Sequence, residues 1–376
     1  MPARQGETTE LRLLLSRLRQ ELLLLVLLAA LPLLLLALPE QAGNLHHLVH
    51  WDTLAALAGL MVLSRGLEES GALTRVGRRL LARVDTERYL ALVLIVLSAV
   101  LAAVVTNDVA LFIVVPLTLG LRLVASLPIG RLIVFEALAV NAGSTISPIG
   151  NPQNLFIWQQ AGVDFTTFFL AMTPLALAMM ALLIAAIPLA FPAKAIHIEP
   201  AGSPPALKPR LAGVSLALYL PLLLAIDAGL ALPAAVVIIT LYLLFQPRVV
   251  RYVDWLLLLV FVLMFMVLGL AAMLDPVVSL VGFLAIWPGG MMTAGALLSQ
   301  GISNVPAAIL LEGFTDDWRT LAWGVSVGGF GLAIGSMANI IALRLAREKG
   351  LWRDFHCWSL PMLLASWLLA LLLLSI

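Results

Sequence analysis

The feature that most constrains the fold is an apolar segment that is interrupted in its middle. Residues 132–158 are long enough to cross a bilayer as one helix. Residues 141–154 within it read N-A-G-S-T-I-S-P-I-G-N-P-Q-N, a run of helix breakers and small polar side chains. Lipid cannot hydrogen-bond the backbone groups that such breakers release, so a broken helix is tolerated only where it faces protein or a water-filled cavity. An interrupted membrane helix is the usual sequence indicator of a transporter's binding site.

A second interrupted stretch lies 185 residues further along the chain. Residues 326–339 read S-V-G-G-F-G-L-A-I-G-S-M-A-N. At this offset the aligned pairs are Gly143 with Gly328, Ile149-Gly150 with Ile334-Gly335, and Asn154 with Asn339. The alternative is a pair of glycine-rich faces that let helices pack closely, but prolines and asparagines contribute nothing to such packing. We therefore expect two broken helices at corresponding places in two halves of the chain.

Composition places the chain among polytopic membrane proteins. Of its 376 residues, 62% are hydrophobic and only 11% are charged, which leaves very little room for a soluble domain. The single cysteine, Cys357, excludes an internal disulfide and a cysteine-built metal site. A net charge of +1 provides no basis for nucleic-acid binding.

Lysines and arginines predict the orientation of the apolar segments, because cytoplasmic loops are enriched in them. The predicted apolar segments are about 21–38, 52–64, 89–104, 108–120, 132–158, 167–190, 211–226, 231–245, 255–274, 283–311, 320–342 and 358–375. Four arginines before residue 20 indicate a cytoplasmic N-terminus, and we interpret 21–38 as a retained first helix rather than a signal peptide. The C-terminus is then expected outside.

The segment 89–120 is predicted to enter the membrane and turn back. Arg122 and Arg131 follow it, and a single crossing would place both outside. We therefore expect a re-entrant hairpin with its turn at residues 106–108, and a second hairpin over 283–311 with its turn at Ser303-Asn304. Two ordinary short helices are the alternative.

These elements predict an all-α polytopic membrane protein with about nine transmembrane helices and two re-entrant hairpins. The whole chain, 1–376, forms one transporter domain. Repeat one spans 20–190, a linker and extra helix span 191–230, and repeat two spans 231–376. Because the extra crossing lies between them, the second repeat is expected to be inverted, as is common in secondary transporters.

The breaks and the hairpin turns predict two pseudo-symmetric half-sites. Half-helix N-termini suit an anion, whereas unwound carbonyls and Asn or Ser oxygens suit Na⁺. The candidate residues are Thr106, Asn107, Asp108, Asn141, Gly143, Ser144, Thr145, Gly150, Asn151, Asn154, Ser303, Asn304, Gly328, Gly335, Ser336 and Asn339. A sodium ion is expected at Thr106, Asn107 and Asp108, or at Ser303 and Asn304. For each single Ser or Asn, a helix cap or an interhelical hydrogen bond is the alternative.

Asp108 breaks the symmetry of the two half-sites, because Val305 stands in its place in the second hairpin. A carboxylate at mid-membrane costs ~3 kcal/mol or more, so it indicates function. Our hypothesis is that Asp108 binds the coupling cation, carries a proton, or does either in turn. Glu136 is a second acid near this path, with a structural role as the alternative.

The chain resembles the ion-transporter superfamily of citrate transporters, divalent anion–sodium symporters, arsenite pump membrane subunits and NhaD-type sodium/proton antiporters. The motifs that carry the resemblance are T-N-D-V-A-L-F-I-V-V-P, which begins at Thr106, and the 141–154 stretch. It extends from about residue 45 to the end and looks closest to the small YbiR-type inner-membrane permeases.

The resemblance implies a scaffold that holds a homodimer and a mobile transport domain that moves as an elevator. In the sodium–dicarboxylate branch each hairpin carries Ser-Asn-Thr, which meets sodium and a substrate carboxylate. Here the matching positions are residues 106–108, Thr-Asn-Asp, and residues 303–305, Ser-Asn-Val. Both depart at the third residue, and an aspartate there resembles the arsenite and sodium/proton branches.

We expect a secondary active transporter in the bacterial inner membrane that moves a small carboxylate-like anion with Na⁺ or H⁺ and needs no cofactor. Its expected partners are the anion, the lipid bilayer and a second copy of the chain. Cation/proton antiport or arsenite-type efflux is the first alternative, and a channel is another. A membrane-embedded enzyme is the alternative from another class, but the sequence has no H-E-x-x-H, G-x-S-x-G or Walker pattern.

Overall fold

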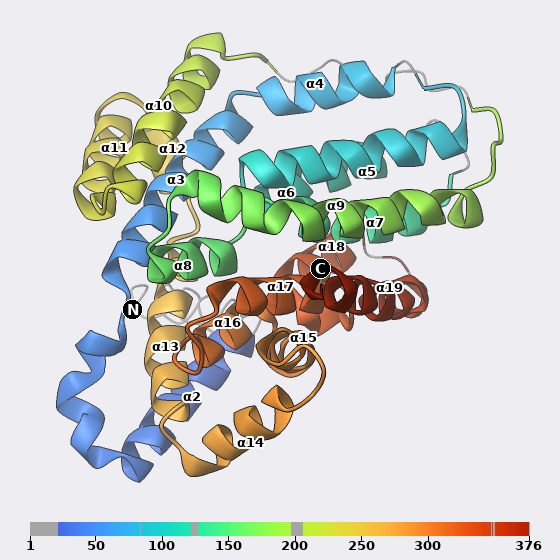
Figure 1. Ribbon diagram of the computed structural model, residues 1–376. Coiled ribbons are helices and arrows are strands. Elements are labelled where there is room, and N and C mark those ends of the chain that lie inside the picture. Colours follow the sequence, from blue (N-terminus) through green and yellow to red (C-terminus); the bar gives the residue numbers. More distant parts are fainter. Residues whose placement is uncertain are drawn as a thin grey trace, which may run out of the picture.

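The computed structural model describes residues 22–82, 84–121, 127–196, 206–346, 348 and 350–375, and this part is almost entirely helical (Figure 1). The elements are α2 (Leu22–Ala37), η1 (Pro39–Leu48), α3 (Trp51–Glu69), α4 (Ala72–Leu81), α5 (Glu87–Val104), α6 (Asn107–Gly120), α7 (Ile129–Ser144), α8 (Pro152–Ala161), α9 (Phe165–Ala190), α10 (Pro209–Asp227), α11 (Ala231–Phe245), α12 (Pro247–Arg251), α13 (Trp255–Ala271), α14 (Asp275–Ala285), α15 (Met291–Ile302), α16 (Asn304–Glu312), α17 (Trp318–Gly328), η3 (Ala333–Gly335), α18 (Met337–Ala346) and α19 (Leu351–Leu374). The predicted all-α class is confirmed.

Several of these helices are long and apolar enough to cross a membrane. In the described part of the chain they are α5, α9, α10 and α19. Two bent pairs, η1 with α3 at 45° and α13 with α14 at 87°, raise the number of candidate spans from 4 to 6. Other apolar helices, such as α6 and α11, are shorter than a full span, so the expected nine crossings stay a prediction.

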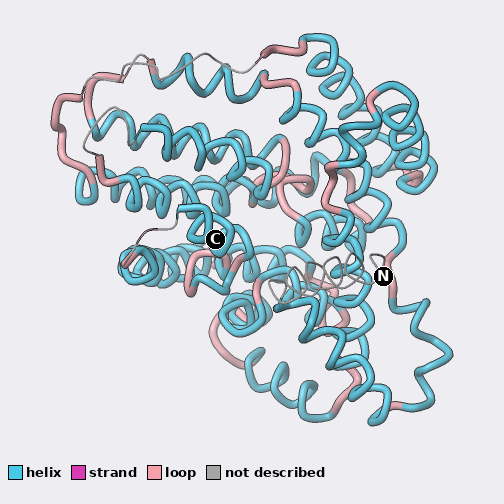
Figure 2. The backbone as a smooth tube through the Cα atoms, turned by 180° about the vertical axis from the view of Figure 1, so that it is seen from behind, coloured by secondary structure: helices cyan, strands magenta, loops and turns pink. Residues whose placement is uncertain are grey.

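The helices form two regions that are visible in Figure 1. Helices α10, α11 and α12 gather against α3 at one corner, while α5, α7 and α9 lie side by side (Figure 1). Seen from behind, the same layer of long helices continues across the molecule (Figure 2). Helix α2 packs along α13 although the two are far apart in sequence.

Both predicted breaks in the apolar segments are present. The segment expected as one interrupted helix over 132–158 is α7 followed by α8, and the one over 320–342 is α17, η3 and α18. The helices following each break pack on the opposite repeat: α8 contacts α16 and α17, whereas α18 contacts α6 and α7. The two breaks are therefore brought together in the middle of the protein.

Two expected boundaries differ from the structure. Residues 39–50, expected as a loop, contain the 3₁₀ helix η1. The second hairpin was expected over 283–311, but its arms are α15 and α16, over residues 291–312. The cause is a stop at Pro288-Gly289-Gly290, where φ is +89° and +55° at the two glycines, a conformation that only glycine adopts at low cost. The apolar residues before this stop form the end of the separate helix α14.

The charge-based orientation stays a prediction. The arginines before residue 20 lie outside the described residues, and so do Arg122 and positions 197–205 of the expected linker.

Glycines allow each first hairpin arm to approach its broken helix closely. A Cβ added at Gly143 of α7 would lie 2.2 Å from the Ala99 carbonyl oxygen of α5. A Cβ added at Gly328 of α17 would lie 2.4 Å from the Ser299 side chain and 3.2 Å from the Ala296 carbonyl oxygen of α15. The aligned glycines of the two halves therefore do the same packing work.

Replacing Gly143 by alanine is expected to destabilise the protein, because the added methyl group would overlap the backbone of Ala99. Overpacking of this kind costs about 1–3 kcal/mol, so the thermal midpoint of the purified protein in detergent should fall. Gly213→Ala in α10 is the matched control, since an added Cβ there meets nothing within 4 Å. Equal midpoints for the two variants would contradict the close approach of α5 and α7.

Candidate functional site

The first break is closed by one asparagine side chain. Asn154 is fully buried in the first turn of α8, and its Nδ2 donates to the carbonyl oxygens of Ser144, Thr145 and Ser147 at 3.0–3.2 Å. These are carbonyls that lose their helical partners where α7 ends. Asn151 caps α8, because its Oδ1 accepts from the Asn154 N–H at 2.8 Å. The polar residues of the break thus replace the hydrogen bonds that the broken helix lacks.

The turn of the first hairpin touches this break. The backbone N–H of Asn107 donates to the Gly150 carbonyl oxygen at 2.9 Å. A Cβ added at Gly150 would lie 2.4 Å from the Ser144 carbonyl oxygen, so the break has no room for a larger residue there. Residues 106–108 and the 141–154 stretch are therefore in direct contact, as the first predicted half-site requires.

The second break repeats this arrangement at the same offset. Nδ2 of Asn339 donates to the Gly329 carbonyl oxygen at 2.9 Å, and Gly329 is the residue that aligns with Ser144. The Ser336 hydroxyl, aligned with Asn151, accepts from the Ala338 N–H at 3.3 Å. The internal alignment made from the sequence thus corresponds to equivalent hydrogen bonds in the two halves.

Three further side chains close the second break, and the sequence did not single them out. Gln300 of α15 donates to the Gly328 carbonyl oxygen at 2.9 Å and accepts from the Leu332 N–H at 2.7 Å. His356 and Ser359 of α19 bind the backbone of Ala333 and Gly331. A glutamine in an apolar hairpin arm was a usable signal for Gln300, whereas nothing in the sequence places α19 beside the break.

One hydrogen bond joins the two breaks. Asn141, at the end of α7, donates from Nδ2 to Oδ1 of Asn339 at 2.9 Å. Both side chains are buried. The Ser144 and Thr145 hydroxyls in turn donate to the Asn141 carbonyl oxygen at 3.1 and 2.9 Å. The predicted polar residues of the two broken helices therefore form one connected network.

Three buried oxygens of this region have no hydrogen-bond partner within the described part of the chain. They are Oδ1 of Asn154 and the hydroxyls of Ser303 and Ser326, and all three side chains are at most 4% exposed. Ser326 aligns with Asn141, so the repeat relation directs it toward Asn154 as Asn141 is directed toward Asn339. Buried polar atoms without partners are rare and call for an explanation such as a bound ion. Sequence reasoning missed Ser326 as a ligand.

The turn of the second hairpin is strained. Ser303 has φ = +76° and is the one non-glycine residue with positive φ among those the structure describes. A left-handed non-glycine residue costs of order 1–3 kcal/mol and persists where its surroundings hold it. Asn304 follows as the first, buried residue of α16. The two predicted hairpin residues thus occupy a conformationally constrained turn between α15 and α16.

The turn of the first hairpin faces a cavity of about 120 Å³. Thr106, Asn107 and Asp108 line it from one side, and α3 and the start of α13 line it from the other. The second hairpin's turn does not line this cavity, so the two predicted sodium half-sites do not share it.

The far wall of this cavity contributes charges that the sequence did not connect with the hairpin. Asp254 caps α13, accepting from the Leu257 N–H at 3.3 Å, and also lines the cavity. On α3, Arg65 pairs with Glu68 at 2.8 Å. Asp108 and Asp254 therefore face one space, while the nearest cation is already held by a carboxylate. Glu136 lies elsewhere, fully buried on α7, where it accepts a hydrogen bond from Thr118 of α6.

Comparison with known proteins places this helical framework in a family. The family model described as citrate transporter matches residues 12–328. The chain belongs to the citrate transporter family. It is a membrane transporter, and the resemblance inferred from the motifs at Thr106 and at 141–154 is confirmed.

Individual members resemble the chain over most of its length. The inner membrane protein YbiR of Escherichia coli is 44% identical over 330 residues, 87% of this chain and 88% of that protein. An uncharacterized transporter of Methanocaldococcus jannaschii is 31% identical over 306 residues, 80% of this chain and 82% of that protein. A Dictyostelium discoideum protein named as an arsB transporter is 25% identical over 131 residues, 35% of this chain and 23% of that protein.

Replacing Ser303 by glycine is expected to separate stability from function. Glycine adopts positive φ without the steric cost, so the thermal midpoint should stay the same or rise by an amount equivalent to ~1 kcal/mol. The buried hydroxyl is lost, and transport in proteoliposomes should fall. Ser299→Ala in α15 is the control, since that hydroxyl only bonds within its own helix. Lower stability together with unchanged transport would contradict both parts.

His356 is expected to make transport sensitive to acid. Its Nδ1 lies 2.6 Å from the Trp352 carbonyl oxygen, which only accepts, so Nε2 is the unprotonated nitrogen that accepts from the Ala333 N–H at 3.2 Å. Protonation removes that acceptor and releases the backbone of the second break. Transport should therefore decline as pH falls through the histidine range, and His356→Gln, whose amide oxygen accepts at any pH, should flatten the profile. An unchanged pH profile in this variant would contradict the assignment.

Proposed function

We propose that the chain is a secondary active transporter of a small carboxylate-like anion, coupled to Na⁺ or H⁺, in the inner membrane of a bacterium. The family's description as citrate transporters supports the substrate class. The similarity to an Escherichia coli protein named as an inner membrane protein supports the location. A homodimer and an elevator motion are part of this proposal through the family resemblance.

The observation that carries the proposal is the set of unpartnered buried oxygens at the paired breaks. Asn154, Ser303 and Ser326 present oxygen atoms without hydrogens directed at them, in the place where two broken helices meet. A desolvated Na⁺ requires several such oxygens, and unwound helices supply them in secondary transporters. The free N–H groups at the start of α8 and α18 lie beside the same breaks and suit the carboxylate of an anion.

Within this proposal the chain consists of two inverted repeats. Helices α5 and α6 form the first re-entrant hairpin and α7 and α8 the first broken helix. Helices α15 and α16, with α17, η3 and α18, are their counterparts in the second repeat. The equivalent Asn154 and Asn339 bonds support this division. The two half-sites each combine a hairpin turn with the break that it contacts.

Asp108 is proposed as the coupling group and Asp254 as its partner. The two carboxylates face the same cavity from different parts of the fold, the hairpin turn and the start of α13. Two anions in one confined space favour uptake of a cation or a proton between them. Movement of the hairpin away from α13 would separate the pair, which links occupancy to conformation.

Cation/proton antiport, or arsenite-type efflux, is the second candidate function. The pair of facing carboxylates favours it, because a site of this kind exchanges Na⁺ for H⁺ without any anion. The match to a protein named as an arsB transporter points in the same direction over a shorter stretch.

Proteoliposomes distinguish the two functions. Na⁺ and H⁺ gradients are imposed separately, and uptake of labelled citrate and succinate is followed together with the internal pH. Gradient-driven uptake supports anion symport. No carboxylate uptake under either gradient, with dissipation of a pH gradient on addition of Na⁺, would replace the proposal by antiport.

Asp108→Asn and Asp254→Asn are both expected to reduce ion-dependent transport, Asp108→Asn to background and Asp254→Asn by about tenfold, since a lost charge in a desolvated site is worth ~1.4 kcal/mol or more. Asp275→Asn is the matched control, because Asp275 begins α14 in an exposed position away from the cavity. Ion dependence that is unchanged in Asp108→Asn would refute the coupling role. Unchanged dependence in Asp254→Asn alone would confine the site to the hairpin.

A further inference from the structure

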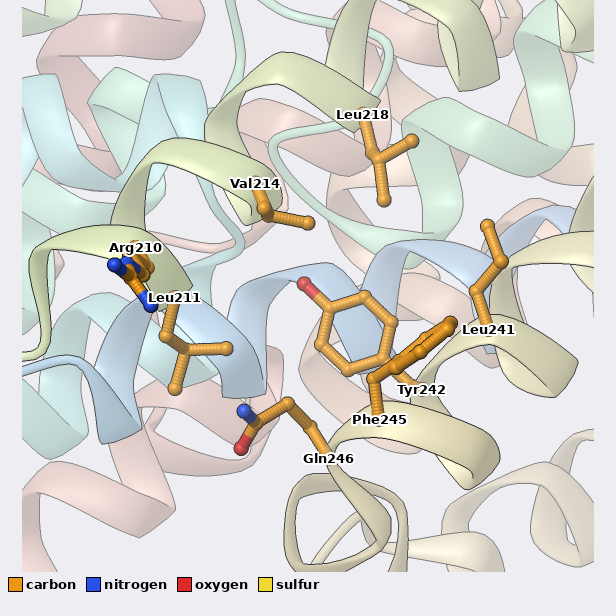
Figure 3. A pocket seen from close by; sticks show the side chains of 8 residues that line it. All are labelled: Arg210, Leu211, Val214, Leu218, Leu241, Tyr242, Phe245 and Gln246. Atoms are coloured by element: carbon orange, nitrogen blue, oxygen red, sulfur yellow. The ribbon is translucent and has the colours of Figure 1, made fainter.

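A groove runs between α10 and α11, on the side of the molecule away from the two breaks (Figure 1). It has a volume of about 280 Å³. Figure 3 shows its lining: Arg210, Leu211, Val214, Leu218, Leu241, Tyr242, Phe245 and Gln246. Five of these eight side chains are aliphatic or phenyl groups, and Arg210 is the charged one.

The polar atoms at the base of the groove are already bonded. The Tyr242 hydroxyl lies 2.6 Å from Ser215 Oγ, which also bonds the Leu211 carbonyl oxygen at 2.8 Å. Gly66 of α3 allows this pair to approach, since an added Cβ would lie 2.4 Å from the Ser215 hydroxyl. The tyrosine therefore presents its ring, and the groove offers an apolar surface to whatever fills it.

The rims of the groove face outward. Val214 is 52% exposed, Leu241 37% and Phe245 73%, although all are large apolar side chains. Helix α10 is one of the candidate membrane spans and α11 is uniformly apolar. In a membrane this surface contacts lipid, so an acyl chain is the molecule that reaches the groove.

Arg210 places a positive charge at one end of the groove. Its neighbours Lys208 and Arg248 both lie 3.5 Å from Glu69 of α3, whereas Arg210 has no carboxylate partner among the described residues. The same end carries Arg251. An excess of basic residues marks the cytoplasmic side of a membrane protein. A free guanidinium at this depth suits a phosphate group.

We propose that the groove binds one anionic phospholipid of the inner leaflet, with an acyl chain between α10 and α11 and its phosphate at Arg210. Basic sites between membrane helices at the cytoplasmic surface recognise such headgroups. A second copy of the chain fits this face less well. A two-fold dimer in a membrane has its axis along the membrane normal, so a symmetric contact here would bring Arg210 against Arg210 of the partner.

Native mass spectrometry of the full-length protein tests the proposal. Purified protein is incubated with equal amounts of phosphatidylglycerol and phosphatidylcholine, and retained lipid is counted per chain. Wild type is expected to retain phosphatidylglycerol in preference. Arg210→Gln should lower that retention about fivefold, since one basic residue contributes about 1 kcal/mol to anionic-lipid binding. Arg251→Gln is the matched control, because Arg251 is exposed at the same end but does not line the groove.

A second pair of variants tests the apolar part without changing charge. Leu218→Trp fills the groove and should lower phosphatidylglycerol retention. Val236→Trp, on a lipid-facing position of α11 that is 55% exposed and outside the groove, should not. Equal retention of both lipids by wild type, or retention unaffected by Arg210→Gln and Leu218→Trp, would overturn the proposal. Loss of a dimer rather than of lipid in Leu218→Trp would assign the groove to a second copy instead.

Discussion

The structure depends on how backbone groups are satisfied where two helices are interrupted in an apolar environment. At each break, helical carbonyls lose their partners and lipid offers no replacement. Asn154 and Asn339 solve this problem from the first turn of the following helix, each by donating its amide hydrogens back across the break. Because each asparagine spans the break, the two half-helices are held in a fixed relation. The hairpin turns and the buried serine hydroxyls can then be placed against that fixed framework.

The two halves are related but not equivalent, and the differences mark where function resides. The bond between Asn141 and Asn339 is made, whereas its repeat counterpart leaves Ser326 and Asn154 without partners. When the hairpin turns are aligned, Gln300 corresponds to Ala103. The second break is therefore closed by its hairpin arm and by α19, while the first is closed by its own side chains. A symmetric framework with an asymmetric set of free oxygens is a reasonable basis for binding an ion at one place and a solute at another.

Charge is distributed according to the same logic. The acid of the first hairpin faces Asp254 across a cavity at the junction with α3 and α13. Basic residues instead gather where α10, α11 and α12 meet α3, and two of them are held by Glu69. The carboxylates are thus available near the proposed transport path, and a free guanidinium is available at the lipid surface. Each class of charge lies where its expected ligand arrives.

Much of the fold was determined by local patterns in the sequence. The breakers of residues 141–154 and 326–339, the apolar segments and the offset of 185 residues specify an all-helical membrane protein with two interrupted helices, because proline, glycine and hydrophobic periodicity act over short distances. The Asn154 and Asn339 positions follow from the same alignment. The approach of Asp254 to the first hairpin, the closure of the second break by His356, and the bond from Asn141 to Asn339 were decided by tertiary structure alone. Each joins residues from distant segments, and no local pattern encodes which helices pack together.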